Sequence, residues 1–222
     1  MAFRLGRCSL SCEDILQEDA CDVRDATMKL RDSGMPTEAY WETLFDVPLI
    51  LDQLGVDSML RDVVELGCGH GTFTLPVARR ITGSLTSVDI EPPMVERTLE
   101  RATAAGLQNL HCQVCDVMTD GFGVEPSSQD AVLFFNILHC EEPVALLREA
   151  ARVVRPGGWV LVIHWRYDPT TPRGPMMEIR PRPEKIVEWA GQAGGLELSG
   201  NVIDLPPWHY GLRFRKVVAA KL

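Results

Sequence analysis

The fold of this chain is decided by residues 63–71, which read Val63-Val64-Glu65-Leu66-Gly67-Cys68-Gly69-His70-Gly71. The first four are mostly apolar, as in a short buried strand, and three glycines at alternating positions follow them. Glycine adopts backbone angles that other residues avoid, and it lets a ligand approach the main chain closely. A helical pattern begins at residue 73, so the stretch predicts a strand, a tight turn and the start of a helix.

Strand and helix patterns alternate around this turn. We expect further strands at 85–89, 110–114, 131–135 and 159–165, and helices at 36–45, 46–55, 73–81, 92–105 and 143–154. The run at 131–135 is entirely apolar, which indicates a central strand. Residues 196–205 and 210–218 predict an antiparallel pair at the sheet edge. The expected fold is α/β: a doubly wound, seven-stranded Rossmann-like sheet, mostly parallel with an antiparallel edge strand, and with helices on both faces.

The length of 222 residues fits one well-buried domain. Residues 1–33 are polar and lack a clear period, which indicates an N-terminal arm. The single domain is expected at 34–222. Its parts are N-terminal helices that form a lid (34–60), a cofactor-binding core (61–165), a substrate loop (166–183), and a C-terminal helix with a β-hairpin (184–222).

Composition narrows the class of partner. The formal net charge is −9, and such an acidic surface repels phosphate backbones, so we expect no nucleic-acid partner. No apolar run approaches the roughly 20 residues of a membrane helix, and none follows Arg4 and Arg7 as a signal peptide would require. We therefore expect a cytoplasmic protein that does not contact a membrane. Its seven cysteines, an odd number, do not suggest a disulfide framework.

Two acidic residues extend the pattern of the glycine turn. Asp89 ends the second predicted strand, 18 residues after Gly71, where a carboxylate can accept both hydroxyls of a ribose. Asp116 follows the third strand and can accept a hydrogen bond from an adenine amino group. Dinucleotide-binding turns have the spacing G-x-G-x-x-G, whereas this chain has G-x-G-x-G preceded by an acid.

With these features the sequence resembles the class I S-adenosylmethionine-dependent methyltransferases, of the type 11-like, small-molecule kind. The resemblance covers about residues 60–165, and five segments carry it in the family's order: 64–71, 88–90, 115–117, 130–139 and 146–158. It implies S-adenosyl-L-methionine as the cofactor and methyl transfer as the activity. Glu65 would orient the ammonium group through the loop, Asp89 would hold the ribose, and Asn136 would reach the methionine end. The implied cofactor-binding set is Glu65, Gly67, Cys68, Gly69, Gly71, Asp89, Ile90, Met94, Asp116, Val117 and Asn136.

The acceptor side has a weaker signature, because methyl transfer from a sulfonium needs positioning more than a nucleophilic residue. His139 follows the central strand and is either a general base or a residue that packs near the cofactor. The same alternatives hold for His164. Tyr40 and Trp41 either form a lid or simply pack, and residues 208–210 could line the same opening.

Residues 166–183 form the most unusual segment. Arg173, Arg180 and Arg182 lie among prolines in an otherwise acidic protein, and arginine forks suit carboxylates and phosphates. They either bind a small acidic substrate or pair with surface acids.

Other functions remain as alternatives. The chain could be a non-catalytic S-adenosylmethionine-binding sensor or partner module. An NAD(P)-dependent oxidoreductase is less expected, because the glycine spacing of the turn differs from that of dinucleotide-binding turns. Cys8, Cys12 and Cys21 could bind a soft metal, but they lie in the predicted N-terminal arm. The pair Cys112-x-x-Cys115 lacks a second pair at zinc spacing. We therefore expect no metal. The acceptor atom and the choice between monomer and homodimer stay open.

Overall fold

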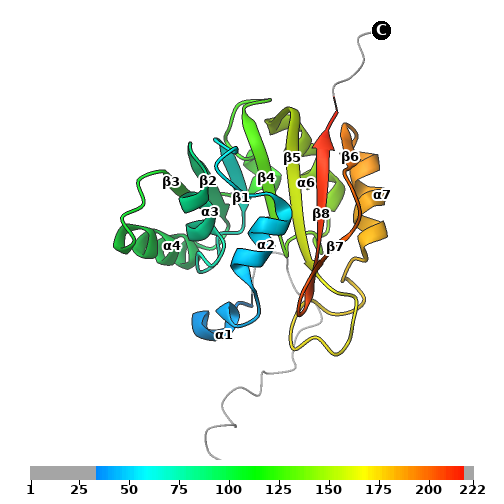
Figure 1. The fold of residues 1–222 in the computed structure, drawn as a ribbon, viewed down its shortest axis with the longest axis horizontal. Coiled ribbons are helices and arrows are strands. Elements are labelled where there is room, and N and C mark those ends of the chain that lie inside the picture. Colours follow the sequence, from blue (N-terminus) through cyan, green and yellow to red (C-terminus); the bar gives the residue numbers. More distant parts are fainter. Residues whose placement is uncertain (1–33, 218–222) are drawn as a thin grey trace, which may run out of the picture.

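The computed structural model describes residues 34–217, so the arm predicted at residues 1–33, with Cys8, Cys12 and Cys21, lies outside the described part of the chain. The described residues form an eight-stranded sheet between two layers of helices (Figure 1). The strand order is β3-β2-β1-β4-β5-β8-β6, and β7 also pairs with β8. The strands are β1 (Val63–Leu66), β2 (Leu85–Asp89), β3 (Leu110–Val114), β4 (Gln129–Phe135), β5 (Val154–Trp165), β6 (Leu196–Leu198), β7 (Ile203–Leu205) and β8 (His209–Lys216).

The first five strands are parallel, and β8 runs antiparallel to β5. Because β1 lies between β2 and β4, the strand order reverses there, and ligands of such sheets bind beyond the carboxyl ends of strands at that point. In Figure 1, α1 and the loop that follows β5 lie at this same end of the sheet. The predicted doubly wound, mostly parallel sheet is therefore confirmed.

Two layers of helices cover the sheet. Helices α2, α3 and α4 form one layer, in which α3 and α4 contact β2 or β3 and α2 contacts α3. Helices α5, α6 and α7 form the second layer, against β4, β5 and β6. The helices are α1 (Glu38–Glu42), α2 (Val47–Leu54), α3 (Thr74–Arg80), α4 (Pro92–Ala104), α5 (Val117–Asp120), α6 (Pro143–Val153) and α7 (Pro183–Ala193).

Alternate side chains of the central strands build two separate cores. In β4, Leu133 and Phe135 face the layer of α2 and α3, whereas Val132 and Phe134 face the layer of α6 and α7. All seven residues of β4 are buried, as predicted for a central strand. Burial on both faces explains why residues 131–135 of this strand form an uninterrupted apolar run rather than an alternating one.

The structure differs from the sequence-based expectation in several details. The segment expected as one strand at 196–205 is broken into β6 and β7 by a turn in which Gly200 has a φ of +82°, which gives the eighth strand. A four-residue helix, α5, follows β3 because the Asp116 carboxylate accepts a hydrogen bond from Met118 N at 3.1 Å and caps it. The first helix covers only Glu38–Glu42, since Thr43 turns the chain.

Candidate active site

The glycine turn lies between β1 and α3, at the carboxyl end of the sheet. Gly67, Gly69 and Gly71 have φ angles of +85°, +50° and +82°, which L-residues rarely adopt. A Cβ at Gly67 would lie 2.9 Å from Ile137 Cδ1, and one at Gly71 would lie 2.6 Å from Leu75 Cδ1. The turn therefore needs glycine both for its backbone angles and for its close contacts.

Asp89 is buried at the end of β2, as predicted, and its carboxylate also shapes the turn. Oδ2 accepts a hydrogen bond from Gly69 N at 3.0 Å, and Oδ1 accepts one from Glu91 N at 3.0 Å. The side chain thus fixes the loop on one side and the approach to α4 on the other. A carboxylate has lone pairs beyond these two bonds, so it can still accept from a ligand hydroxyl.

Glu65 lies beneath the turn. Its Oε2 accepts hydrogen bonds from Thr74 Oγ1 and Ser87 Oγ, both at 2.7 Å, and the residue is only 1% exposed. Burial raises the pKa of this carboxyl to about 7, although the hydrogen bonds from the two hydroxyls act to lower it. The side chain joins the start of α3 to β2, so any effect on a cofactor acts through the loop, which is the indirect role that the resemblance implied.

Asn136 follows β4 in a left-handed conformation with a φ of +59°. Its backbone N–H donates to Ile163 O at 2.9 Å. Within residues 34–217, neither atom of its buried side-chain amide has a hydrogen-bond partner. A buried unpaired amide costs about 1–3 kcal/mol, so the position suits a ligand that offers both a donor and an acceptor. The amino-acid end of S-adenosylmethionine has both, and together with the glycine turn this residue fits that group.

The remaining residues of the expected cofactor set surround the same end of the sheet. Cys68 and Val117 are buried, and Ile90 and Met94 are partly buried. The neighbouring Cys112 thiol, followed by burial, raises the pKa of Cys68 well above its usual range, so this thiol stays protonated. Cys112 itself is partly buried, because β3 is the sheet edge.

The two histidines of the acceptor side lie close together. The ring centroids of His139 and His164 are 5.5 Å apart in an edge-to-face arrangement. His164 has no exposed surface, and among the described residues neither of its ring nitrogens has a partner in hydrogen-bond geometry. Burial first, and Arg180 second, lowers the pKa of His139 to about 4. Burial also lowers the pKa of His164 well below its usual range. Both rings are therefore neutral at physiological pH.

The three loop arginines have different surroundings. Arg182 is exposed and stacks on the Tyr167 ring, with its guanidinium carbon 3.7 Å from the ring centroid. Arg173 is exposed and donates to the carbonyl oxygen of Gly34.

Arg180 corrects the expectation of a substrate-facing cation. It is buried, and its guanidinium donates to Pro175 O at 2.7 Å and to Thr171 Oγ1 at 2.6 Å. The carbonyl oxygens of Arg166 and Asp168 accept further bonds, each at 3.1 Å. A polar group buried in a loop must find partners there, and these bonds occupy the donors that a substrate would need.

The N-terminal helix α1 lies against the aromatic core of one face. Trp41 packs on Phe45 and Trp165, with ring centroids 4.9 and 6.3 Å apart, whereas Tyr40 is 41% exposed. His209 is buried against Phe45 and Trp165, rather than lining an opening.

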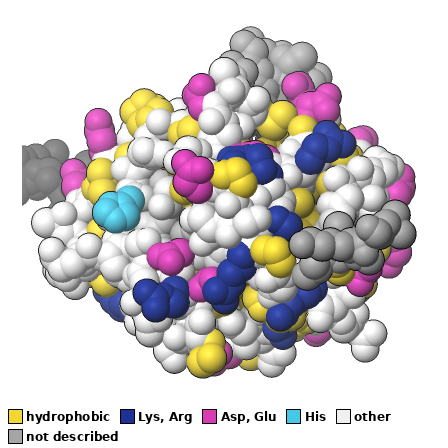
Figure 2. Space-filling model, turned by 90° about the horizontal axis from the view of Figure 1, so that it is seen from above, with side chains coloured by type: hydrophobic (Ala, Val, Ile, Leu, Met, Phe, Trp, Pro, Cys, Tyr) yellow, Lys and Arg dark blue, Asp and Glu magenta, His cyan; other side chains and the backbone are white. Residues whose placement is uncertain are grey.

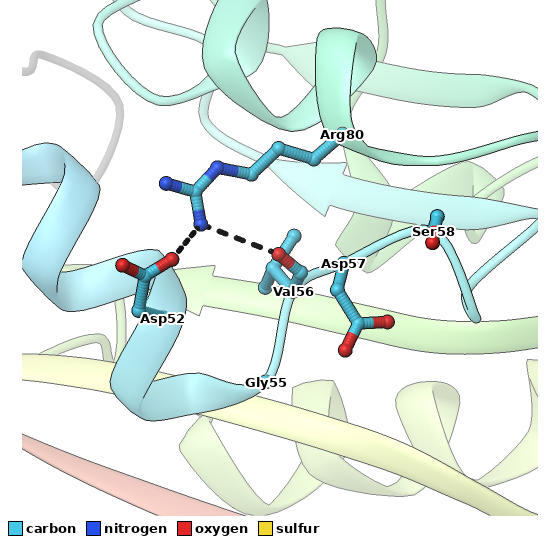
Figure 3. A pocket seen from close by; sticks show the side chains of 6 residues that line it. All are labelled: Asp52, Gly55, Val56, Asp57, Ser58 and Arg80. Carbon is cyan, nitrogen blue, oxygen red and sulfur yellow. Dashed lines mark hydrogen bonds and ion pairs between the residues drawn. The ribbon is translucent and has the colours of Figure 1, made fainter.

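The opposite end of the sheet has a different character. A shallow pocket of about 310 Å³ lies there, where α2 and α3 end, lined by Asp52, Gly55, Val56, Asp57, Ser58 and Arg80 (Figure 3). Arg80 fills part of it by donating to Asp52 Oδ1 at 2.5 Å. The view of this end in Figure 2 shows acidic and basic side chains interspersed, without one large patch of either kind. The pocket is thus far from the carboxyl ends of the strands.

Residues 34–217 contain no group of three or more His, Cys, Asp or Glu side chains placed to hold a metal ion. None of the helices in this part of the chain is both long and apolar enough to cross a bilayer.

Residues 63–158, which include the glycine turn, Asp89 and Asn136, match the family model described as a methyltransferase domain. Over these residues the chain is similar to S-adenosylmethionine-dependent methyltransferase domains. The ubiquinone biosynthesis O-methyltransferase of Neisseria meningitidis serogroup C is 30% identical over 139 residues, which are 60% of this chain and 57% of that protein. The 23S rRNA (uracil(1939)-C(5))-methyltransferase RlmD of Alcanivorax borkumensis is 40% identical over 77 residues, 35% of this chain and 17% of that protein.

The solved structures agree on the fold of the methyltransferase domain. A SAM-dependent methyltransferase from Aquifex aeolicus superposes with a TM-score of 0.71 at 21% identity, covering 82% of this chain and 94% of that one. The chain spans less than two thirds of the length of these two curated relatives.

Sequence reasoning missed two residues that hold the turn of this methyltransferase domain. Thr98 Oγ1 donates to Gly69 O at 2.9 Å, and Arg101 Nη1 donates to His70 O at 2.7 Å. Both come from α4. Thr98 lies on the buried face of that helix with Val95 and Ala102, and a hydroxyl among apolar positions at helical spacing was the available signal.

Proposed function

We propose that this protein transfers a methyl group from S-adenosyl-L-methionine to a small molecule. The observation that carries the proposal is the joint geometry of the glycine turn, the buried Asp89 that holds it, and the unpaired amide of Asn136 at the next strand end. The bound cofactor would supply an electrophilic methyl group on a sulfonium. The task of the chain is then to bind and orient the two reactants and to exclude water.

The cofactor would lie across the carboxyl ends of β2, β1 and β4. In this proposal the Asp89 carboxylate accepts the ribose hydroxyls, and Asn136 pairs with the amino-acid end. Ile90, Met94 and Val117 supply apolar contacts to the adenine. Residues 35–36, just before α1, contact the turn: Pro36 O lies 3.0 Å from His70 Nε2, and a Cβ at Gly69 would lie 3.2 Å from Met35 Cε.

The acceptor would lie beside His139 and His164, beyond β4 and β5. A neutral imidazole can accept a proton or a hydrogen bond from the acceptor, but a pKa of about 4 makes His139 a weak base. It would therefore orient an acceptor, or take the proton of one that is already acidic. The exposed Arg173 and Arg182 favour a small acidic substrate over a cationic one, and the net charge of −9 disfavours a nucleic acid.

Calorimetric titration with S-adenosylmethionine, S-adenosylhomocysteine and NAD tests the cofactor. We expect binding of the first two, and tight binding of NAD alone would overturn the proposal. Asp89→Ala should abolish binding. Asp57→Ala is the matched control, because Asp57 also accepts a backbone N–H, from Met59 at 2.8 Å, but lies at the opposite end of the sheet. Methyl transfer from radiolabelled cofactor to a panel of small carboxylic acids and phenols then separates an enzyme from a non-catalytic sensor.

A further inference from the structure

One side of α4 holds the glycine turn by two carbonyl oxygens. Thr98 Oγ1 donates to Gly69 O, and Arg101 Nη1 donates to His70 O at 2.7 Å. Thr98 and Arg101 are three residues apart, so they lie on the same face of the helix. The carbonyl oxygens that they bind belong to consecutive residues of the turn. Asp89 holds the N–H of Gly69 from the other side. The conformation of the turn thus depends on groups outside it.

The same Arg101 guanidinium also binds α1. Its Nη2 donates to Glu42 Oε1 at 2.7 Å, and its Nη1 lies 3.1 Å from Glu38 Oε1. Arg97, one turn earlier on α4, donates from Nε to Glu38 Oε2 at 2.7 Å. The hydrogen bond from Arg97 is the main cause of the lowered pKa of Glu38, so this carboxylate is charged at neutral pH. Two acids of α1 therefore face two arginines of α4.

The segment before α1 contacts the turn directly. His70 Nε2 lies 3.0 Å from Pro36 O, and a Cβ at Gly69 would lie 3.2 Å from Met35 Cε. The turn, residues 35–36, α1 and α4 are thus joined in a ring of contacts. Arg101 is the one residue of the described chain whose side chain bonds both to the turn and to α1.

We propose that Arg101 is a positioning residue that couples closure of α1 over the site to the cofactor-binding conformation of the turn. With one guanidinium shared between His70 O and the two α1 carboxylates, loss of either contact weakens the placement of the other. The side chain is 23% exposed, so its charge-assisted hydrogen bonds are shielded more than those of a fully exposed pair. The inference rests on the proposed function, because it takes the turn as the cofactor site.

The variant Arg101→Gln tests the coupling, with Arg80→Gln as its matched control. Arg80 also joins two helices through an acid, Asp52, and also donates to backbone carbonyls, but it touches neither the turn nor α1. The first readout is hydrogen–deuterium exchange of the ligand-free protein. We expect R101Q to speed exchange in residues 36–45 and 67–72 together, and R80Q to leave both segments unchanged. Faster exchange in one segment only, or in neither, would overturn the proposal.

The second readout is calorimetric affinity for S-adenosylhomocysteine at low and high sodium chloride. R101Q should bind about tenfold or more weakly than R80Q, since one charge-assisted bond to the turn and the closure of α1 are both lost. Salt screens partly exposed ion pairs, so affinity should fall with salt in the wild type and much less in R101Q. Equal affinities, or equal salt dependence, would contradict the coupling. If the wild type bound no S-adenosylhomocysteine, the proposed function would fail, while the exchange experiment would still decide whether Arg101 couples the two segments.

Discussion

The Asp89 carboxylate accepts a hydrogen bond from the backbone N–H of Gly69, with an oxygen-to-nitrogen distance of 3.0 Å. The acid expected to hold a ribose therefore also holds the glycine turn that faces the same ligand. One side chain combines a direct contact with a structural one, so its substitution affects both.

Asp89→Asn should separate charge from shape. The amide keeps one oxygen acceptor but replaces the other by a donor, so one of the bonds to Gly69 N and Glu91 N must be lost. A hydrogen bond to a charged group contributes about 1.5–3 kcal/mol. We expect affinity for S-adenosylhomocysteine to fall by about 10- to 100-fold, measured by calorimetry, and Tm to fall by a few degrees. An unchanged affinity would place the ribose elsewhere.

Asn136→Gly should raise stability and weaken cofactor binding. Asn136 has a φ of +59°, which glycine adopts without strain, and its buried amide has no partner within the described residues 34–217. Removal of the unpaired amide should stabilise the fold by about 1 kcal/mol, or about 2–4 °C in Tm. Affinity for S-adenosylhomocysteine should fall in the same variant. Thermal unfolding and calorimetry check the two effects, and a loss of stability would mean that the amide is satisfied in the free protein.

The sequence was informative where a local pattern determines the structure. The apolar run at 131–135 and the glycines of the turn predicted β4 and the cofactor site, because burial on both faces and positive φ angles each require particular residue types. Helix α5 was missed, since four residues are too few to show a helical period. The role of Arg180 was also missed, because composition reveals a cation in a loop but not whether its side chain turns inward.

Arg180→Lys should release the substrate loop. Lysine keeps the charge, but it cannot reproduce the planar fork that binds the carbonyl oxygens of Arg166, Asp168 and Pro175. We expect trypsin to cleave the loop after Arg173 at least several-fold faster in this variant than in the wild type. Mass spectrometry of the digest measures the cleavage rate. Arg182→Lys is the matched control, because Arg182 is exposed and stacks only on Tyr167. Equal cleavage rates in the two variants would argue against Arg180 as the anchor of the loop.

His209→Phe should make the protein more resistant to acid. His209 is buried against Phe45 and Trp165, and burial, helped by the charges of Arg166 and Arg180, lowers its pKa to about 3. In the unfolded chain a histidine takes up its proton near pH 6.5, whereas the native ring stays neutral. The unfolded state therefore binds more protons below pH 6.5, and this histidine costs stability as the pH falls from 6.5 towards 3.

The measurement is the free energy of unfolding of both proteins by urea between pH 7 and 4. The difference in favour of the variant should grow by about 1.4 kcal/mol for each pH unit below 6.5, whatever its value at pH 7. Glu65, whose pKa is raised to about 7, gives the opposite slope between pH 4.5 and 7, but it is present in both proteins and cancels in the difference. A difference that stays constant with pH would show that His209 titrates normally, and hence that water reaches its ring.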